Sequence, residues 1–482
     1  MRSPFIAVVC LLFLSSAHAV NVTSVAMPEY LQKPEIPQGI PLEQFGKDVA
    51  PRQQGKIEIL RLADSKDLLK TIYSSSFVRF AQLQQQIPQG IVLTDGNITL
   101  ERLSSELPNI VEKRSNGDFL ARLPIIIDIG AELVINNSQR LLLARDKGVF
   151  IHNNGTLTVI GGSIFGWDLT TKTMSDYAGD VSLFRPFIIA FGGSVTRLKS
   201  ASIGALGFDE SSSYGFTVRT ATPATLDRLS PRERQIVEKP PVVFVQDSQF
   251  SDMYVGLYMD GAVDSYVVDS DIADSIDTGI LIANQSRNIT LLRNAVSGTQ
   301  NKHGIVVSTG AEKSVVMHNK VYLNERSGVL IDRLASPALI AFNDIHANGK
   351  DGISVYESFT PEIYGNRVYK NRSHGIRVRG SQAAKLHHNI ILSNQGAGVY
   401  LHNAASNSDT EASAEVLGGL IVENASGAVY ANDQTSLILG GLKIENNGAQ
   451  EYRGDLTSKT GDIIVATWKD GTAALITEDN AQ

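Results

Sequence analysis

The chain is 482 residues long, carries a formal net charge of −7 and has 43% hydrophobic residues. This mild acidity argues against a nucleic-acid-binding protein, which usually has a basic surface. It leaves an anionic ligand open, because a local basic groove matters more than the sum of the charges. The 41 glycines and the low aromatic content of 7% indicate a chain rich in β-strands and turns.

The first 19 residues have the pattern of a signal peptide. Arg2 supplies the positive charge, Phe5 to Leu14 form an apolar segment, and residues 17–19 read Ala-His-Ala, a small-x-small cleavage site. The segment is too short to span a bilayer, and no later run reaches about 18 apolar residues, so we expect no membrane span. The single cysteine, Cys10, lies inside the peptide, which leaves the mature chain without a disulfide or a cysteine metal site. A large exported protein without disulfides is typical of a bacterial periplasm.

An internal repeat dominates the middle of the chain. Each repeat places a glycine before an apolar-x-apolar pattern, and the glycines follow one another at intervals of 23, 25, 24, 24, 23 and 23 residues. Two series of polar residues recur at nearly the same intervals as the glycines. The repeat glycines are Gly256, Gly279, Gly304, Gly328, Gly352, Gly375 and Gly398. The polar series are Asp271, Asn294, Asn319, Asn343, Asn366 and Asn389, and then Asn324, Asn348, Asn371 and Asn394.

This period matches one coil of a right-handed parallel β-helix, whose coils stack about 4.8 Å apart. The first and third residues after each glycine are apolar, as in Ile353 and Val355, so we expect them to point inward while the second and fourth point outward. Glycine suits corners whose backbone angles a Cβ would resist, and asparagine suits corners where side chains stack in a hydrogen-bonded ladder. Leucine-rich repeats have a similar period but need a Leu-x-x-Leu-x-Leu frame, which is missing. The predicted fold is all-β: a right-handed parallel β-helix, a solenoid of about 24-residue coils, with a small, partly helical N-terminal capping region.

Four parts follow from these patterns: a signal peptide (1–19), an N-terminal extension and capping region (20–120), the β-helix (121–445) and a C-terminal cap or tail (446–482). Both ends of a solenoid need covering, because they would otherwise expose apolar core and unpaired strand edges.

Within these parts, helical spacing at 65–87 and at about 99–113 predicts two helices, the second of which is able to plug the open end. A stretch at 220–240, rich in Pro, Thr and charge, predicts a loop inserted into one coil. The region after Asn403 looks irregular, with two closing strands at its end. Weaker coils are predicted at 132–137, 140–152, 155–165 and 183–216, and the closing strands at 463–468 and 473–476.

Outward positions of the repeat stack into rows along one wall. Position four after each glycine gives Ala283, Ser308, Asp332, Tyr356, Arg379 and His402, and position five gives Asn284, Thr309, Arg333, Glu357, Gly380 and Asn403. Such a wall is either a solvated surface or a groove for a polymer. The second interpretation is favoured by guanidinium groups, which pair with sugar carboxylates, and by tyrosine rings, which pack against sugars. The candidate binding residues are Lys302, Asp332, Arg333, Tyr356, Glu357, Arg377, Arg379, Tyr400 and His402.

Other kinds of site leave no pattern in the sequence. His303 and His374 each precede a repeat glycine, where a structural corner role is the more common one. No His/Asp/Glu cluster has metal-ligand spacing, and there is neither a Gly-x-Ser-x-Gly elbow nor a phosphate loop. We therefore predict no metal and no cofactor.

From about residue 184 to 402 the chain resembles the periplasmic mannuronan C5-epimerases, β-helix proteins that convert mannuronate into guluronate within polymannuronate. The resemblance rests on collinear stretches at 185–187 (Arg-Pro-Phe), 356–358 (Tyr-Glu-Ser), 365–368 (Gly-Asn-Arg-Val) and 374–379 (His-Gly-Ile-Arg-Val-Arg). It implies an acidic polysaccharide of the alginate type as ligand, a periplasmic location, and other periplasmic polysaccharide-export proteins as candidate partners.

The catalytic motif of that family is replaced in this chain. The resemblance places the family's Asp-Pro-His-Asp, whose His is the expected base, at residues 281–284, which read Leu-Ile-Ala-Asn. It places the Arg that neutralises the substrate carboxylate at Thr309. Epimerisation removes the proton at C5, so it needs a base and a group that stabilises negative charge, and losing a base typically costs about 10²–10⁴-fold in rate. We therefore regard Leu281, Ala283, Asn284 and Thr309 as degenerate catalytic positions.

Three hypotheses remain open from the sequence. The first is a catalytically degenerate relative that still binds an acidic polysaccharide during its biosynthesis or export. The second is an active uronan epimerase or lyase with a relocated base, for which His303 is the fallback candidate beside Lys302. The third is a structural or assembly role without glycan contact.

Overall fold

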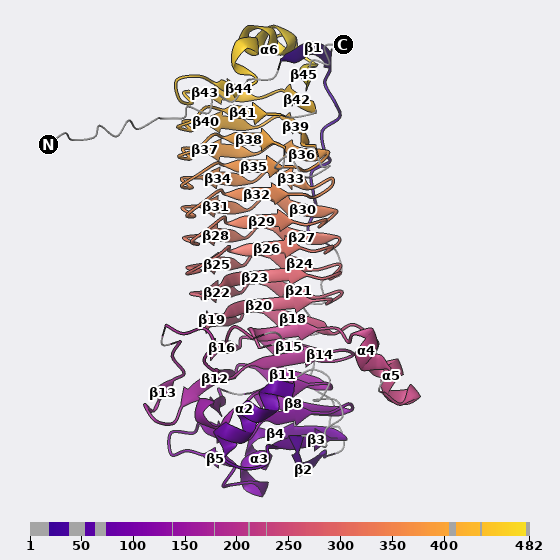
Figure 1. The fold of residues 1–482 in the computed structure, drawn as a ribbon, viewed down its shortest axis with the longest axis vertical. Coiled ribbons are helices and arrows are strands. Elements are labelled where there is room, and N and C mark those ends of the chain that lie inside the picture. Colours follow the sequence, from indigo (N-terminus) through magenta and orange to yellow (C-terminus); the bar gives the residue numbers. More distant parts are fainter. Residues whose placement is uncertain are drawn as a thin grey trace, which may run out of the picture.

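The computed structural model describes residues 19–37, 54–62, 74–136, 138–177, 179–210, 213–227, 229–403, 411–433 and 436–478. These residues form a long solenoid whose coils each contribute one strand to each of three sheets, so the predicted parallel β-helix is confirmed (Figure 1). The predicted signal peptide lies, except for Ala19, outside the described residues. None of the described helices is long and apolar enough to cross a membrane.

The first sheet, sheet A, is parallel from β4 to β42 and ends in two antiparallel strands. Its order is β4 (Gly96–Thr99), β8 (Ala131–Asn136), β11 (Thr156–Ile160), β15 (Val195–Lys199), β18 (Val242–Gln246), β21 (Tyr266–Val268), β24 (Thr290–Leu292), β27 (Ser314–Met317), β30 (Ala338–Ala341), β33 (Glu362–Tyr364), β36 (Ala384–His387), β39 (Ser413–Leu417), β42 (Ser436–Gly440), β45 (Thr472–Glu478) and β1 (Val20–Ala26).

Sheet B forms the wall in which the sequence places the candidate site. Its order is β2 (Lys56–Arg61), β3 (Gln89–Thr94), β7 (Ile125–Ile127), β10 (Ile151–Asn153), β14 (Ile188–Phe191), β17 (Gly215–Arg219), β20 (Val255–Asp260), β23 (Thr278–Ala283), β26 (Ile305–Ser308), β29 (Val329–Asp332), β32 (Ile353–Tyr356), β35 (Ile376–Arg379), β38 (Val399–His402), β41 (Val429–Asn432) and β44 (Tyr452–Gly454).

Sheet C completes each coil. Its order is β5 (Val111–Lys113), β6 (Phe119–Ala121), β9 (Arg140–Ala144), β12 (Ser163–Asp168), β16 (Ser202–Leu206), β19 (Gln249–Met253), β22 (Asp271–Ala273), β25 (Ala295–Ser297), β28 (Lys320–Tyr322), β31 (Asp344–His346), β34 (Arg367–Tyr369), β37 (Ile390–Leu392), β40 (Leu420–Val422) and β43 (Lys443–Glu445). The short β13 (Thr173–Met174) pairs antiparallel with β12.

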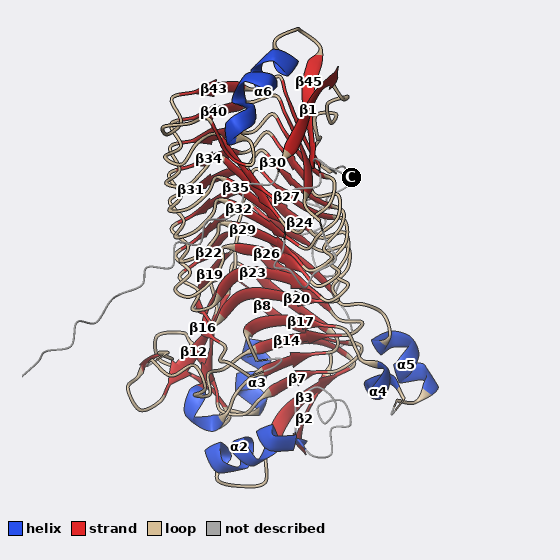
Figure 2. Ribbon diagram, turned by 45° about the horizontal axis from the view of Figure 1, so that its top comes forward, coloured by secondary structure: helices blue, strands red, loops and turns tan. Residues whose placement is uncertain are grey.

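Helices lie at the ends and side of the solenoid rather than inside it (Figure 2). They are α2 (Ser74–Gln84), α3 (Leu100–Glu106), α4 (Pro223–Leu226), α5 (Pro231–Val237) and α6 (Thr460–Thr467). Helix α3 lies at the N-terminal end and buries Leu100 and Leu103 in the core, whereas α2 packs against the outer side of sheet B. The predicted helix at 99–113 is shorter than expected, because residues 111–113 form β5, and α4 and α5 lie in the predicted insertion at 220–240. The boundaries of the four sequence parts stay predictions.

The core is a continuous apolar column between the three sheets. Ile353 and Val355 are fully buried in it, which confirms the period-two pattern after each glycine. The repeat glycines have a different role from the predicted one, since their φ angles are not in the left-handed region. A Cβ at Gly352 would lie only 2.2 Å from Val368 Cγ1, so lack of space excludes larger residues there.

Two buried asparagine ladders bind neighbouring coils together. In one, each side-chain amide from Asn294 to Asn366 donates to the asparagine of the next coil, as in Asn319 Nδ2 to Asn343 Oδ1 at 3.0 Å. The other runs through Asn324 and Asn348 and extends beyond the predicted register to Asn424 and Asn447. Placing Asp271 in the first ladder was wrong: Ser270 occupies that level, because the repeat is one residue longer there.

The C-terminal part is more regular than predicted. The residues after Asn403, apart from 404–410, which lie outside the described ranges, form two further coils, with Ala428 at the level of the repeat glycines. The predicted strand at 463–468 is helix α6 instead, and it caps the solenoid by burying Ile463 and Ala466. The second predicted strand is confirmed as β45, which pairs with the N-terminal β1 (Figure 1). The N-terminal strand β1 therefore closes the far end of the molecule.

We predict that Asn348→Ala destabilises the protein by at least about 2 kcal/mol, because the amide is fully buried and its loss leaves several backbone and side-chain groups of adjacent coils without partners. The measurement is the denaturant midpoint, with the exposed Asn301→Ala as control. Equal midpoints for the two variants would show that the asparagine ladder does not contribute to the stability of the fold.

Candidate functional site

Of the two rows predicted from the sequence, the position-four row lies on the outward face of sheet B. The position-five residues, such as Thr309 and Arg333, directly follow the strands and have positive φ angles, so they lie at the corner beside this face. Strand pairing places the position-four side chains on successive coils, and Asp260 of β20 extends this row by one coil. The position-two row runs beside it. Its members from β20 to β44 are Tyr258, Leu281, Val306, Leu330, Ser354, Arg377, Tyr400, Tyr430 and Arg453.

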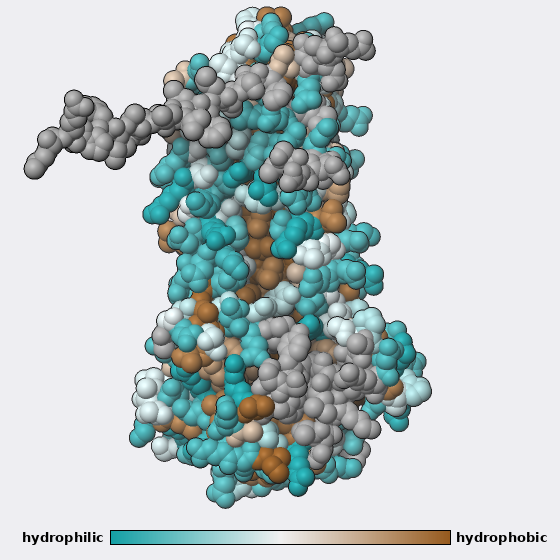
Figure 3. Space-filling view, in the orientation of Figure 1, coloured by the Kyte–Doolittle hydropathy of each residue, from teal (hydrophilic) through white to brown (hydrophobic). Residues whose placement is uncertain are grey.

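The middle of this face is apolar. Val306 and Leu330 point outward from the sheet yet are only 6% and 7% exposed, and Leu281 packs against Tyr258. Figure 3 shows this hydrophobic strip over β23, β26 and β29, between polar side chains on both sides. It offers a surface for the apolar faces of sugar rings rather than a group for acid–base chemistry.

Toward the C-terminal coils the face becomes cationic and aromatic. The guanidinium of Arg379 lies 4.3 Å from the ring centroid of Tyr356, and that of Arg377 lies 5.5 Å from the ring of Tyr400. Tyr400 also stacks on Tyr430 with 4.6 Å between centroids. These contacts hold the arginines in place, because a cation is attracted to the face of an aromatic ring.

Three cations on this face, Arg333, Arg379 and Lys302, each have an acidic neighbour. Arg333 Nε lies 2.8 Å from the carboxylate of Asp332 and is 66% exposed, while Arg379 lies 3.7 Å from Glu357. At the rim, Lys302 Nζ lies 3.0 Å from Asp277. Such exposed pairs contribute little to stability, so a polyanionic ligand is able to compete for these cations.

His402 is held as a neutral acceptor. Its Nδ1 donates to the carbonyl of Asn403 at 2.8 Å, and its Nε2 accepts from Arg377 Nε at 3.0 Å. Burial, helped by the charge of Arg377, lowers the pKa of His402 to about 4. The ring therefore positions Arg377 and is uncharged near neutral pH.

His303 is poorly suited to act as a base. Its Nδ1 accepts from the backbone N–H of Ser327 at 3.2 Å, so in the neutral ring the proton sits on Nε2. Burial, followed by the charge of Arg326, lowers the pKa of His303 to about 4. His374 repeats this arrangement with the N–H of Ala397 at 3.0 Å, and burial lowers its pKa too.

The four positions to which the resemblance assigns the family's catalytic groups, Leu281, Ala283, Asn284 and Thr309, contain no proton acceptor suited to C5 chemistry. Ala283 is 5% exposed, and Asn284 donates to the hydroxyl of Tyr258 at 3.3 Å. The hydroxyl of Thr309 is 2.9 Å from that of Ser308. Together with Leu281 they form a neutral patch beside the apolar strip.

A cluster of polar and aromatic residues at the N-terminal end of the rows was not predicted from the sequence. Arg219 and Asp260 form an ion pair at 3.6 Å, and the rings of Tyr214 and Tyr254 gather around Tyr258 at the same level. Burial raises the pKa values of Tyr258 and Asp260. Extending positions two and four to the first repeat glycine would have found Tyr258 and Asp260. The other members come from strands and loops without a clear repeat.

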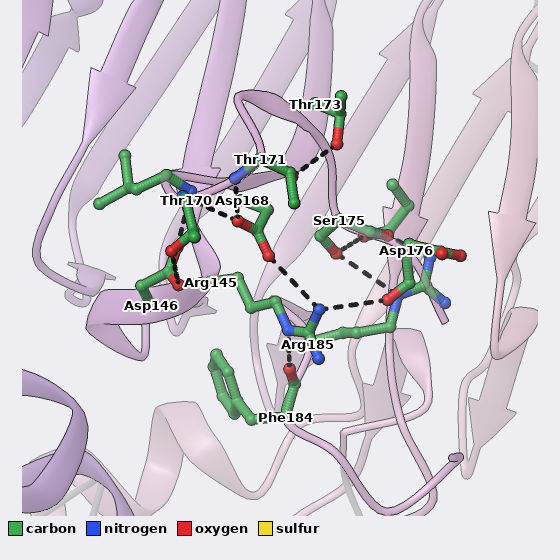
Figure 4. Close-up of polar contacts among 12 residues, drawn as sticks. Arg145, Asp146, Asp168, Thr170, Thr171, Thr173, Ser175, Asp176, Phe184 and Arg185 are labelled. Atoms are coloured by element: carbon green, nitrogen blue, oxygen red, sulfur yellow. Dashed lines mark hydrogen bonds and ion pairs between the residues drawn. The ribbon is translucent and has the colours of Figure 1, made fainter. Parts of the chain in front are cut away.

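The Arg-Pro-Phe stretch at 185–187 lies away from these rows. Arg185 is only 1% exposed, donates to Ser175 and forms a 2.8 Å ion pair with Asp252 (Figure 4 shows its surroundings). Nearby, Arg145 donates to the carbonyl of Phe184 and lies 3.6 Å from Asp168. These contacts fasten the connection after β13 to the solenoid.

Among the described residues, no group of three or more His, Cys, Asp or Glu side chains could hold a metal ion.

Comparison with known proteins identifies the family. Residues 255–414 match the model described as "Right handed beta helix region". The chain is 32% identical over 441 residues to the mannuronan C5-epimerase of Pseudomonas putida, covering 88% of this chain and 83% of that protein. It is also 32% identical over 430 residues to that of Pseudomonas aeruginosa, covering 86% of this chain and 78% of that protein. The chain belongs to the mannuronan C5-epimerase family.

The solved structures agree with this family. The crystal structure of the periplasmic alginate epimerase AlgG superposes with a TM-score of 0.80 at 29% identity, covering 87% of this chain and 99% of that chain. The family predicted from the sequence is confirmed, and so is the right-handed parallel β-helix. The candidate site residues stay predictions.

The lowered histidine pKa values predict that acid destabilises the fold. The pKa is about 4 for His303 and His402 in the folded state, against an unfolded value of about 6.5, so the unfolded state binds more protons between these pH values. Stability is therefore expected to fall as pH drops from 6.5 toward 4. Denaturant midpoints at a series of pH values check this, and a His402→Gln variant is expected to show a shallower slope. A wild-type midpoint that rises on acidification would contradict it.

Proposed function

We propose that this protein binds an acidic polysaccharide of the polymannuronate type along the outward face of sheet B and does not epimerise it. The proposal is supported by membership of the mannuronan C5-epimerase family together with the cationic and aromatic rows from β29 to β44. It is further supported by Ala283 and Thr309, which stand where the resemblance places the base and the carboxylate-neutralising arginine.

The retained half of the face has the chemistry that a polyuronate needs. Arg333 directly follows β29, and Arg377 and Arg379 both lie on β35, two coils further along the same face, so these cations are spread along the direction in which carboxylates recur on a polymer. Tyr356 contacts the guanidinium groups of both Arg377 and Arg379, which restrains these two side chains and lowers the entropy lost on binding. This cationic ladder is the observation that carries the proposal.

The residues of the neutral patch, Leu281, Ala283, Asn284 and Thr309, disfavour epimerisation. Removal of the C5 proton needs an acceptor within hydrogen-bonding reach and a positive group near the carboxylate. Leu281, Ala283 and Thr309 supply neither. An active epimerase or lyase with His303 as a relocated base remains the alternative, but the Nδ1 contact with Ser327 leaves that ring without a free acceptor.

In the cell, we place this binding in the periplasm during polysaccharide biosynthesis or export. The sequence predicts a cleavable signal peptide, and the similar structure AlgG is a periplasmic alginate epimerase. A protein that holds the polymer without changing it would guide or protect the polymer, and other periplasmic export proteins are its expected partners.

The first test concerns catalysis. We expect no deuterium at C5 above background when the protein is incubated with polymannuronate in D₂O, because the base and the neutralising cation are both replaced. The measurement is ¹H NMR of the recovered polymer, with enzyme-free polymer as control. Deuterium incorporation that disappears in His303→Ala would support the relocated-base alternative, and incorporation that persists would point to another base.

The second test concerns the cationic ladder. We expect Arg377→Ala combined with Arg379→Ala to weaken binding of long oligomannuronates more than of di- or trisaccharides, because each contact contributes only roughly 0.5–1.5 kcal/mol and a longer chain engages several of them. Wild-type affinity is expected to fall as salt rises. Calorimetric titration with oligomers of increasing length measures both effects.

A charge-matched control is Arg367→Ala combined with Arg287→Ala, which removes one arginine from sheet C and one from the connection between β23 and β24. This variant is expected to bind as wild type does. Equal weakening in both double variants would mean that net charge alone attracts the polymer, and no weakening in either would place the ligand elsewhere.

A further inference from the structure

The outward face of sheet B is open only along part of its length. On the N-terminal coils, its outward side chains are covered by a second hydrophobic core, here called the outer core. It is built from α2, from loops beside β14 and from the insertion with α4 and α5. Its members are Leu62, Phe80, Val92, Ile126, Phe150, Phe184, Phe187, Ile189, Phe191, Phe208, Leu226 and Val237.

This outer core rises above the sheet as an additional layer. Phe150 stacks on Phe187 at 5.0 Å, and Phe184 and Phe208 lie 5.4 Å apart over them. The insertion is fastened to the same coil, since Gly193 N–H donates to the carbonyl of Lys239 at 2.6 Å. The outer core therefore covers the outward side chains of Val92, Ile126 and Ile189 and makes a step on this face of sheet B.

The step falls between β14 and β20. Thr217 of β17 still points outward but is fully buried, whereas Tyr258 on the next coil is partly exposed. Tyr214 lies 5.4 Å from Tyr258 and 5.7 Å from Tyr254, and the Arg219–Asp260 pair lies beside them. These five residues, here called the end wall, stand where the open face stops.

The opposite end of the face has no such barrier among the described residues. The position-two row continues through Tyr430 to Arg453, whose guanidinium lies 5.6 Å from the Tyr430 ring and which is exposed. A polymer lying on the cationic ladder can therefore continue past the last coils, but it cannot continue past the end wall in line with the rows.

We infer that the face binds a polyuronate by a chain end, with the terminal sugar against the end wall and the rest of the chain along the ladder. This inference rests on the proposed function. It adds that the recognised ligand is a chain terminus rather than a stretch within the chain.

The end wall has groups that distinguish a terminus chemically. A terminal sugar carries a hydroxyl where an internal sugar has a glycosidic oxygen, and only the hydroxyl is able to donate a hydrogen bond. The Asp260 carboxylate is an acceptor for that donor, and the hydroxyl of Tyr258 and the guanidinium of Arg219 are donors beside it. The terminal hydroxyl adds a donated hydrogen bond to this carboxylate that a glycosidic oxygen cannot make, so the site favours a chain end.

Binding stoichiometry tests this directly. Sedimentation of wild-type protein in excess with short and with long polymannuronates of narrow size distribution should give one protein per chain at both lengths. A number of bound proteins that grows with chain length overturns the inference while leaving the proposed function intact. Absence of binding at both lengths overturns the proposed function and this inference together.

Modified ends provide the second measurement. Hexamers reduced to an alditol at one end, and lyase-cut hexamers whose other end is unsaturated and lacks the 4-hydroxyl, are compared with unmodified hexamers. One of the two modifications is expected to weaken binding at least tenfold, and equal affinity for all three overturns the inference.

Asp260→Ala should lower the affinity for unmodified hexamers about 10- to 100-fold relative to wild type, as expected for a hydrogen bond to a charged group, whereas Asp344→Ala on sheet C should leave it unchanged.

Discussion

Parallel hydrogen bonding between successive coils positions every functional side chain of this molecule. Because each strand pairs with the equivalent strand of the next coil, a residue at one repeat position lies about 4.8 Å from its equivalent. The asparagine ladders reinforce this at the corners, where a one-residue shift would leave several buried amides unpaired. Glycines such as Gly352 allow the coils to approach, since a side chain there would collide with the next coil.

On the proposed function, stacking explains how a binding surface persists while the family's catalytic centre is lost. The rows consist of many similar positions, and each arginine is held by neighbours of its own, as Arg379 is by Tyr356 and Glu357. Replacing the residues at 281–284 removes a local constellation but leaves the ladder on β29 to β44 in place. Affinity for a polymer is distributed over coils, whereas acid–base chemistry depends on a few atoms on one coil.

The parts predictable from the sequence are those that follow the repeat. The inward Ile353 and Val355, the outward rows and the asparagine ladders all recur at fixed intervals, so their places could be read without coordinates. Three features escaped because they depend on contacts between distant segments. The pairing of β1 with β45, the helical cap at 460–467 and the outer core that ends the open face leave no periodic signal. Asp271 shows a further limit, since a single longer repeat moved the ladder position to Ser270.

The most direct measurement of whether this face still holds polymannuronate in the family's register is restoration of the missing groups. A variant that combines Leu281→Asp, Ala283→His, Asn284→Asp and Thr309→Arg is incubated with polymannuronate in D₂O beside the wild-type protein, after circular dichroism has established that both are folded. Deuterium at C5 is expected with the restored variant and not with the wild type. Incorporation by the wild type, or a folded variant that binds the polymer but exchanges nothing, would contradict a binding face that lost only its reaction centre.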